Sequence, residues 1–337
     1  METSAESASG ERLILANARV RTLLPEIPTA EAVGVAHGRI QAVGTLSEVR
    51  AALGRAREID LAGATVVPGL IDAHGHLAMM GERMRQLDLS GARSPEEVAA
   101  LVAARAAGAA EGEWLVGRAW DQNRFECGGL PDRACLDRVA PDVPVFLERV
   151  DGHAAWANSR ALEAGGIGRD SPDPPGGRIL RDSAGEPIGI LLDAAMKPVT
   201  DRLPAPTEAE LEARLLAAAA RCAGFGLTAV HDAGVDLRTW TVLERLARQG
   251  RLPVRVYAMA WRGAASFEEL IGSGPRIGLF DGMLTLRAVK FLADGALGSR
   301  GAALFEDYCD EPGQKGLLVE LDLLERDASR MLRSGFQ

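Results

Sequence analysis

The sequence predicts an α/β fold that contains part of a TIM-type (β/α)8 barrel. From residue 207 onward, short apolar stretches typical of strands alternate with stretches typical of helices, which is the order expected of parallel β/α units. Barrel strands are expected near Leu70, Leu227, Val254 and Leu286. Because a closed barrel of this type needs eight strands, the sequence accounts for the first half of one.

Local signals place the other elements. The dipeptide His37-Gly38 is typical of a tight turn and predicts a hairpin. A capping-box spacing marks two helix starts, at Ser94 with Glu97 and at Thr207 with Glu210. Helices are therefore expected over 46–53, 94–110, 207–223, 240–249, 267–271 and 321–333. Further strands are expected over 13–22, 32–43, 114–120, 144–150, 178–180, 188–192 and 284–293.

Composition narrows the functional class. The chain has 337 residues, of which 47% are hydrophobic and 25% charged, as is usual for a globular protein with one large and one small domain. A net charge of −9 without a basic cluster argues against a nucleic-acid partner. No apolar run reaches the ~20 residues that a membrane-spanning helix needs, and METSAESASGERL does not resemble a signal peptide. We therefore expect a cytoplasmic protein with no membrane partner.

The stretch TVVPGLIDAHGHL, residues 65–77, carries the clearest chemical signal. A turn at Pro68-Gly69 precedes a predicted strand, and alternate residues of a strand share one face, so His74 and His76 project together. Two neutral imidazoles side by side are half of a site for zinc or a similar divalent ion. The pair alone is also compatible with two ordinary polar residues near a strand end. The four cysteines are scattered without a C-x-x-C spacing, so no thiolate metal site is expected.

Lys290 allows two interpretations. On the predicted strand 284–293 it shares a face with Ala288 and Leu292, and a buried lysine without a partner is unfavourable and tends towards the neutral amine. A neutral amine can add carbon dioxide, and the resulting carbamate is an anionic ligand that bridges metal ions. The alternative is a lysine that extends to solvent or pairs with Asp294. The residues alone favour this alternative.

Two segments resemble a known family. VVPGLIDAHGHL resembles the first-strand signature of the metal-dependent amidohydrolase superfamily. AVKFLADGALGSRGAAL resembles the carboxylated-lysine strand of its N-substituted formamide deformylase-like branch, and this reverses the preference at Lys290. The resemblance implies that His74, His76 and carboxylated Lys290 hold one or two divalent ions, with zinc expected. It also implies a catalytic role for Lys290 and Asp294.

The same resemblance suggests residues that contact the substrate. His153 lies in DGHAAWANSRAL, a segment typical of the branch, and is expected to contact substrate and not metal. A structural histidine near Asp151 is the open alternative. His231 and Asp232 end the second barrel strand, where at most one of the two can point inward. Arg300 is expected to meet an anionic or carbonyl oxygen of the substrate, with a surface arginine as the alternative.

The resemblance also implies the domain organisation. Residues 1–10 are expected to be a disordered tail, 11–64 part of a small β-sandwich domain, and 65–337 an incomplete barrel with an insertion at about 78–224. In the family, a strand that begins like Gly335-Phe336-Gln337 leads to further histidine ligands and a late aspartate base. Since this sequence ends at Gln337, we expect a C-terminally truncated form that lacks the general base.

The functional prediction combines these points. We expect a metal-dependent amidohydrolase that cleaves a non-peptide carbon–nitrogen bond of a small-molecule substrate by means of a metal-activated water. Homo-oligomers are compatible with the sequence. The rival prediction is a non-catalytic, amidohydrolase-like protein that keeps the fold for binding or assembly.

Overall fold

The computed structural model describes residues 11–110, 112–126, 128–295, 297, 300–317 and 320–337. The tail expected at 1–10 lies outside these residues. The chain divides into two compact units. The small unit comprises the described part of Met1–Ala73 together with Cys222–Val230, and the large unit comprises the described part of His74–Arg221 and of His231–Gln337.

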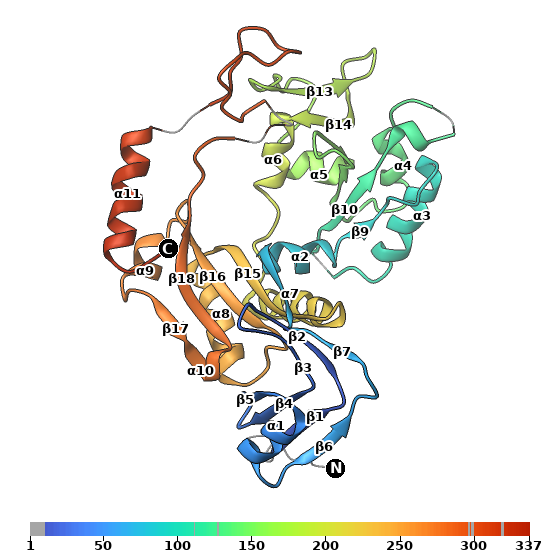
Figure 1. The fold of residues 1–337 in the computed structure, drawn as a ribbon. Coiled ribbons are helices and arrows are strands. Elements are labelled where there is room, and N and C mark those ends of the chain that lie inside the picture. The colour runs from blue at the N-terminus through green and yellow to red at the C-terminus, as the bar shows by residue number, and fades with distance from the viewer. Residues whose placement is uncertain (1–10, 111, 127, 296, 298–299, 318–319) are drawn as a thin grey trace. The chain divides into compact units, whose positions relative to one another are not determined.

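The small unit is built from two sheets. One has the strand order β5-β4-β1-β6 and the other β3-β2-β7. Val20, Val33 and Val66 come from both sheets and share one apolar cluster, so the sheets pack face to face as a sandwich (Figure 1). The strands are β1 (Arg12–Ala16), β2 (Arg19–Leu24), β3 (Ile27–Ala30), β4 (Ala32–Ala36), β5 (Arg39–Gly44), β6 (Arg57–Asp60) and β7 (Thr65–Val66).

Two local predictions in the small unit are confirmed. His37 and Gly38 form the turn between β4 and β5, with φ angles of 53° and 69°. Helix α1 (Leu46–Leu53) has the predicted bounds, and Thr45 with Glu48 forms a capping box at its start. Val49 and Leu53 of α1 are buried against the sheet because the helix is apolar on that face.

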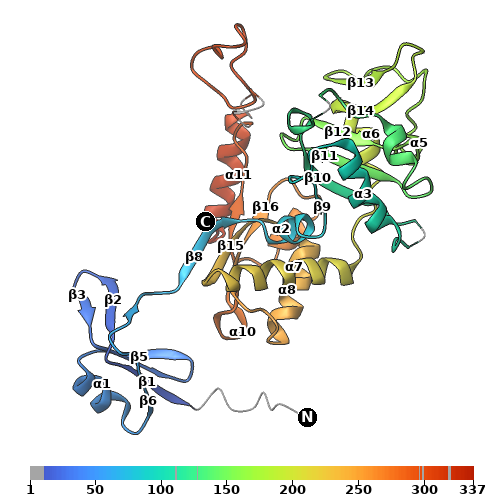
Figure 2. The same cartoon turned by 90° about the vertical axis from the view of Figure 1, so that its right-hand side faces the viewer.

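The insertion in the large unit is a six-stranded mixed sheet of order β13-β14-β12-β11-β10-β9. Alternate residues of its strands enter two separate cores, for instance Val145 and Phe146 of β11, so helices cover both faces (Figure 2). The strands are β9 (Leu87–Asp88), β10 (Leu115–Trp120), β11 (Val145–Arg149), β12 (Ala154–Ala157), β13 (Gly177–Arg181) and β14 (Pro187–Asp193). The helices are α2 (Leu77–Arg83), α3 (Pro95–Ala106), α4 (Arg133–Asp137), α5 (Ser159–Ala164) and α6 (Lys197–Thr200), with 3-10 turns at Gln122–Arg124 and Ala194–Met196.

The four strands expected in the barrel lie with an additional antiparallel strand, β17, in an open sheet of order β17-β18-β16-β15-β8, and the described residues do not close it into a barrel. Strands β15, β16 and β18 lie side by side (Figure 1). The strands are β8 (Leu70–Gly75), β15 (Leu227–Val235), β16 (Arg255–Trp261), β17 (Arg276–Gly278) and β18 (Leu284–Lys290). The helices are α7 (Glu208–Gly224), α8 (Leu237–Arg248), α9 (Phe267–Ile271), α10 (Leu279–Gly282) and α11 (Leu321–Arg333).

The predicted helix caps were partly right. At α7, the Thr207 amide donates to Glu210 Oε2 at 2.7 Å and the Glu210 amide donates to Thr207 Oγ1 at 3.2 Å, a complete capping box. At α3, Ser94 Oγ accepts from the Glu97 amide at 3.1 Å, but Glu97 Oε2 accepts from the Arg93 amide instead of the Ser94 amide. The side-chain cap of Ser94 was therefore predicted correctly, and the return hydrogen bond from the Ser94 amide to Glu97 was predicted wrongly. No helix in the described ranges is long and apolar enough to cross a membrane.

Candidate metal site and its surroundings

His74 and His76 lie at the end of β8, as the sequence predicts. The strand ends at Gly75, and His76 is the residue immediately before α2. The two imidazole rings meet edge to face, with centroids 5.5 Å apart. Partial burial lowers the pKa of His76, and the positive charges of His74 and Lys290 lower it further. The neutral imidazole, which is the form that binds a metal, is therefore favoured at His76.

Lys290 is the last residue of β18 and is half-buried opposite Trp261 of β16. The strand is shorter than predicted, so Leu292 and Asp294 lie beyond it and are exposed. Asp294 Oδ2 accepts a hydrogen bond from the Ala303 amide at 3.0 Å. The pairing of Lys290 with Asp294 was the alternative to carboxylation, and the ion pairs of the described residues do not include it.

The donor set fits a divalent ion only in part. In the ranges that the structure describes, no group of three or more His, Cys, Asp or Glu side chains is arranged to hold a metal ion. This chain offers the two imidazoles of β8 and the amine of Lys290. Since an ammonium group repels a cation, Lys290 becomes a useful third donor only after carboxylation.

Asp232 is the most strongly perturbed acid near this site. It lies on β15, is 3% exposed, and accepts a hydrogen bond from the Leu77 backbone amide. Burial raises its pKa to about 7 because the charged form is poorly solvated there. Its Oδ2 atom has no hydrogen-bond partner among the described residues. His231 and Asp232 were both candidates from the sequence, and which of the two points inward was left open.

His231 projects from the other face of β15. It is half-buried, and its ring lies 4.8 Å from the ring of Tyr257 on the neighbouring strand β16. This opposite orientation of adjacent residues agrees with the expected alternation along a strand. A role for His231 in substrate binding stays a prediction.

His153 lies between β11 and β12 and is held by two acids. Its Nδ1 is 2.7 Å from Asp193 Oδ1, and its backbone amide donates to Asp151 Oδ1 at 3.1 Å. Arg149 in turn binds both oxygens of Asp151, at 2.8 and 2.7 Å. Asp193 was missed because it lies 40 residues from His153; the available signal was an acid at the end of the strand PIGILLD.

Arg300 is engaged by its own loop. Its guanidinium lies 3.0 Å from Asp310 and 3.1 Å from Glu311, and the hydrogen bond with Asp310 raises its pKa. The described contacts are therefore those of a surface ion pair. A contact between Arg300 and substrate stays a prediction.

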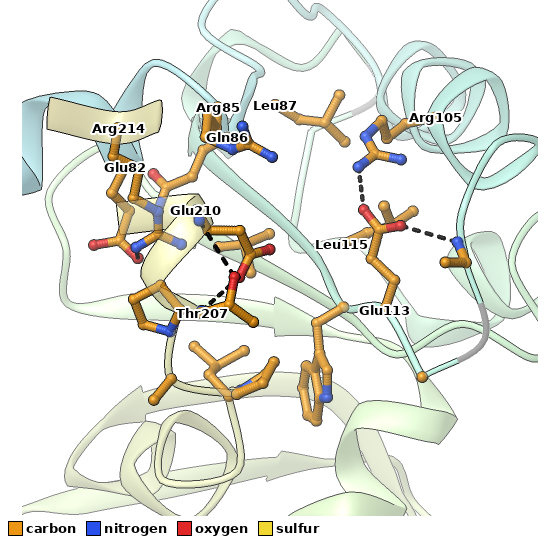
Figure 3. A pocket seen from close by; sticks show the side chains of 18 residues that line it. Glu82, Arg85, Gln86, Leu87, Arg105, Glu113, Leu115, Thr207, Glu210 and Arg214 are labelled. Atoms are coloured by element: carbon orange, nitrogen blue, oxygen red, sulfur yellow. Dashed lines mark hydrogen bonds and ion pairs between the residues drawn. The ribbon is translucent and has the colours of Figure 1, made fainter. Parts of the chain in front are cut away.

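Two cavities adjoin α2. One, of about 340 Å³, is lined by His76 and Asp232 among others, and the second, of about 720 Å³, is lined by α2, the start of β10 and the segment 203–214 (Figure 3). They share Glu82, Pro206 and Arg214, so their walls are continuous. The ion pair Arg214–Glu82, at 3.2 Å, borders both cavities, and the ion pair Arg105–Glu113 borders the larger one. The surroundings of His76 thus include a cavity on the scale of a small molecule.

Comparison with known proteins extends these observations. The profile of the amidohydrolase family matches residues 57–327. YtcJ of Bacillus subtilis is 35% identical over 315 residues, which cover 90% of this chain and 58% of YtcJ. The N-substituted formamide deformylase of Arthrobacter pascens is 41% identical over 186 residues, which cover 54% of this chain and 34% of that protein.

A solved structure is similar over most of the chain. An uncharacterized metal-dependent hydrolase of Pyrococcus horikoshii superposes with a TM-score of 0.78 at 26% identity, over 97% of this chain and 64% of that one. The chain spans less than two thirds of the length of YtcJ, the deformylase and this hydrolase.

Proposed function

The chain belongs to the amidohydrolase family, and from this premise we propose that it is a metal-dependent hydrolase of a small molecule. The scissile bond is a carbon–nitrogen bond other than a peptide bond. The name of the deformylase relative supports this choice, because it states that this relative acts on N-substituted formamides. The substrate proposed here is accordingly a small amide-type compound.

The observation that carries the proposal is the arrangement of His74, His76 and Lys290. The two rings lie 5.5 Å apart at the end of β8, and Lys290 lies close enough to His76 for its charge to affect that pKa. His74 and His76 would hold the ion through neutral imidazole nitrogens, with zinc as the proposed metal. When bound, such an ion polarises a carbonyl group and lowers the pKa of water.

Lys290 completes this set as a carbamate. The neutral amine nitrogen attacks the carbon of carbon dioxide, a nitrogen–carbon bond forms, and the proton leaves to solvent, so the product carries one negative charge. The charge reversal converts a group that repels a cation into one that binds it.

His153 is proposed to bind the substrate. Asp193 fixes the Nδ1 side of the ring, which leaves Nε2 on the half-exposed side free to exchange a hydrogen bond with an amide. His231 and Arg300 are proposed as further substrate contacts, and Asp294, in the segment after β18, as a catalytic group. The cavity lined by His76 and the larger one that shares its wall support a small-molecule ligand of this kind.

The rival function is non-catalytic binding or assembly. It is favoured by one observation, that the described residues contain no three-membered cluster of His, Cys, Asp and Glu fit for a metal. The two functions differ in metal content. A hydrolase of the proposed kind retains a divalent ion, whereas a protein that only keeps the fold has no need of one.

The test is metal analysis of the purified protein and of two variants. We expect at least one divalent ion per chain, and the double variant His74→Ala/His76→Ala should lose most of it because few donors remain. His37→Asn is the matched control, since it removes a histidine at a turn and the new residue tolerates the local φ of 53°. Undiminished metal in the double variant would falsify the ligand assignment.

A further inference from the structure

We propose that Asp232 is a positioning residue for the metal ligand His76, because its buried side chain holds the backbone amide of Leu77. This role depends on the metal site proposed above. It assigns a function to an acid that lies 155 residues beyond Leu77 in the sequence and contacts no described cation. The inference is carried by three observations on the junction between β8, α2 and β15.

The first observation is the hydrogen bond itself. Leu77 is the first residue of α2 and is 1% exposed, so its amide cannot be satisfied by bulk water. His76 occupies the N-cap position but makes no side-chain cap hydrogen bond. Asp232 supplies the missing acceptor from β15. The backbone directly after His76 is thereby tied to a strand of the sheet.

The second observation is that β15 also contacts the His76 ring. A Cβ atom built on Gly234 would lie 3.7 Å from His76 Nδ1 and 3.8 Å from Cε1. The imidazole therefore lies against Gly234, two residues beyond Asp232 on the same strand. The ring and the backbone of His76 are restrained by one short segment, so a change at Asp232 should alter the direction of the ligand nitrogen.

The third observation is that an acid at position 232 lowers the stability of the fold. Its neighbours Val230, Ala233 and Val235 are buried and apolar, and Oδ2 of Asp232 finds no partner within the described residues. A buried polar atom without a partner costs stability, and an apolar side chain would avoid this cost. A buried acid among apolar neighbours is expected where function requires it.

A matched pair of variants separates the hydrogen-bonding role of Asp232 from its contribution to packing. Asp232→Asn keeps an oxygen that can accept from Leu77, whereas Asp232→Leu has a similar volume and no acceptor. Loss of a residue that orients a metal ligand typically weakens metal affinity by roughly 10- to 100-fold. We expect such a loss in Asp232→Leu and near-normal affinity in Asp232→Asn.

The experiment measures cobalt(II) affinity by competition with a chelator, together with the cobalt absorption spectrum as a report of ligand geometry. Both variants are first checked for the wild-type thermal transition, and Asp232→Ala replaces the leucine variant if that one does not fold. A weaker affinity and a changed spectrum in the acceptor-free variant, restored in Asp232→Asn, support the proposal. Equal affinities and spectra in all three proteins overturn it, as does a loss that Asp232→Asn shares in full.

A second readout does not need the metal. Hydrogen exchange of the Leu77 amide in the metal-free protein should accelerate at least tenfold in the acceptor-free variant and stay near wild type in Asp232→Asn. Unchanged exchange overturns the positioning role even if no metal binds. Failure of the wild-type protein to bind cobalt, with the expected exchange pattern intact, counts against the proposed function and leaves the contact between Asp232 and Leu77 supported.

Discussion

Lys290 lies at the end of β18 with its side chain half-buried and its charge within reach of His76. As an ammonium ion it would oppose a divalent cation at the two histidines, and as a carbamate it would attract one. If Lys290 is a carbamate, an added carboxylate should partly replace it in a variant that lacks the lysine. If Lys290 is an ammonium ion, an added carboxylate should have no such effect. This difference allows the chemistry of one side chain to be tested without knowledge of the substrate.

We expect Lys290→Ala to lose most of the bound metal, and acetate or formate in the buffer to restore part of it. A carboxylate can occupy the space of the lost carbamate, whereas it offers nothing to a site that has lost only a cation. Metal content is measured with and without the acid. Near-normal values in Lys290→Met would contradict the carbamate, because methionine keeps the packing of the stem but cannot be carboxylated.

The His153–Asp193 pair gives a second test at the level of single residues. Asp193→Asn weakens the contact that orients the imidazole, so we expect Kd for a small amide to rise roughly tenfold, the loss of about one hydrogen bond. Metal content should not change, because His153 is proposed to contact substrate only. Glu163→Gln removes a surface ion pair with Arg160 and is the control. Equal Kd values in the two variants would remove His153 from the binding site.

Among the elements, α11 forms ion pairs with Arg262, which follows β16, and with Glu268 of α9. Asp327 accepts from Arg262 at 2.8 and 2.6 Å, and Glu268 accepts from Arg330 at 2.8 and 2.6 Å. Hydrogen bonds from the two arginines lower the pKa values of both acids from their ordinary values of 3.8 and 4.5. The stabilisation is therefore present above those values and is lost as the pH falls through the lower, folded-state values.

We expect the backbone of α11 to exchange its amide hydrogens faster once the pH falls below about 4, after correction for the intrinsic pH dependence of exchange. Asp327→Asn should show faster exchange already at pH 7, because its amide side chain cannot form the charged pair. Glu325→Gln changes an exposed acid on the same helix and serves as the control. Protection of α11 that is the same in all three proteins would show that apolar packing alone holds the helix.

Helix α7 provides a test of local stability next to the cavities. The capping box of Thr207 and Glu210 starts the helix that brings Leu211 and Arg214 to the pocket of His76. Thr207→Ala should lower the free energy of unfolding by about 1 kcal/mol, measured by denaturant titration. Thr241→Ala, at an exposed mid-helix position of α8, is the control. A Thr207→Ala variant as stable as wild type would mean that the start of α7 is held by other contacts.

For the molecule as a whole, the sequence predicted correctly those features that depend on neighbouring residues. The bounds of α1, the turn at His37-Gly38 and the capping box at Thr207 each depend on residues within one turn of the chain. The family was also predictable, because VVPGLIDAHGHL and AVKFLADGALGSRGAAL are long and distinctive, and the match over residues 57–327 confirms it.

Contacts between distant residues could not be predicted. His153 meets Asp193 across 40 residues, and Asp232 meets the Leu77 amide from another strand, and neither pairing leaves a periodic pattern in the sequence. The early end of β18 at Lys290 was missed for a similar reason, since the residues that follow remain apolar. The proposed domain limits of 11–64 and 65–337, with the insertion at about 78–224, and the proposed truncation stay predictions.

Exposed apolar side chains make a prediction about association. Leu70 and Ile71 of β8 are 60% and 54% exposed, Leu292 after β18 is 54% exposed, and Phe305 is fully exposed. Exposed apolar side chains promote contact between copies, and β8 is in addition an edge strand of its sheet. We expect the chain to self-associate with rising concentration in sedimentation experiments, and Leu70→Lys/Leu292→Lys to reduce this. A monodisperse monomer with a cooperative thermal transition would contradict this expectation.

The central claim, that His74, His76 and carboxylated Lys290 hold a divalent ion, is tested most directly by anomalous diffraction at the zinc absorption edge. We expect an anomalous peak about 2.0–2.1 Å from one nitrogen of each imidazole, and electron density for a carbamate on Lys290 that reaches the same ion. Crystals of His74→Ala/His76→Ala provide the control and should lack the peak. A zinc-loaded crystal with no peak at the histidines, or with an unmodified Lys290 directed away from the ion, would contradict the account.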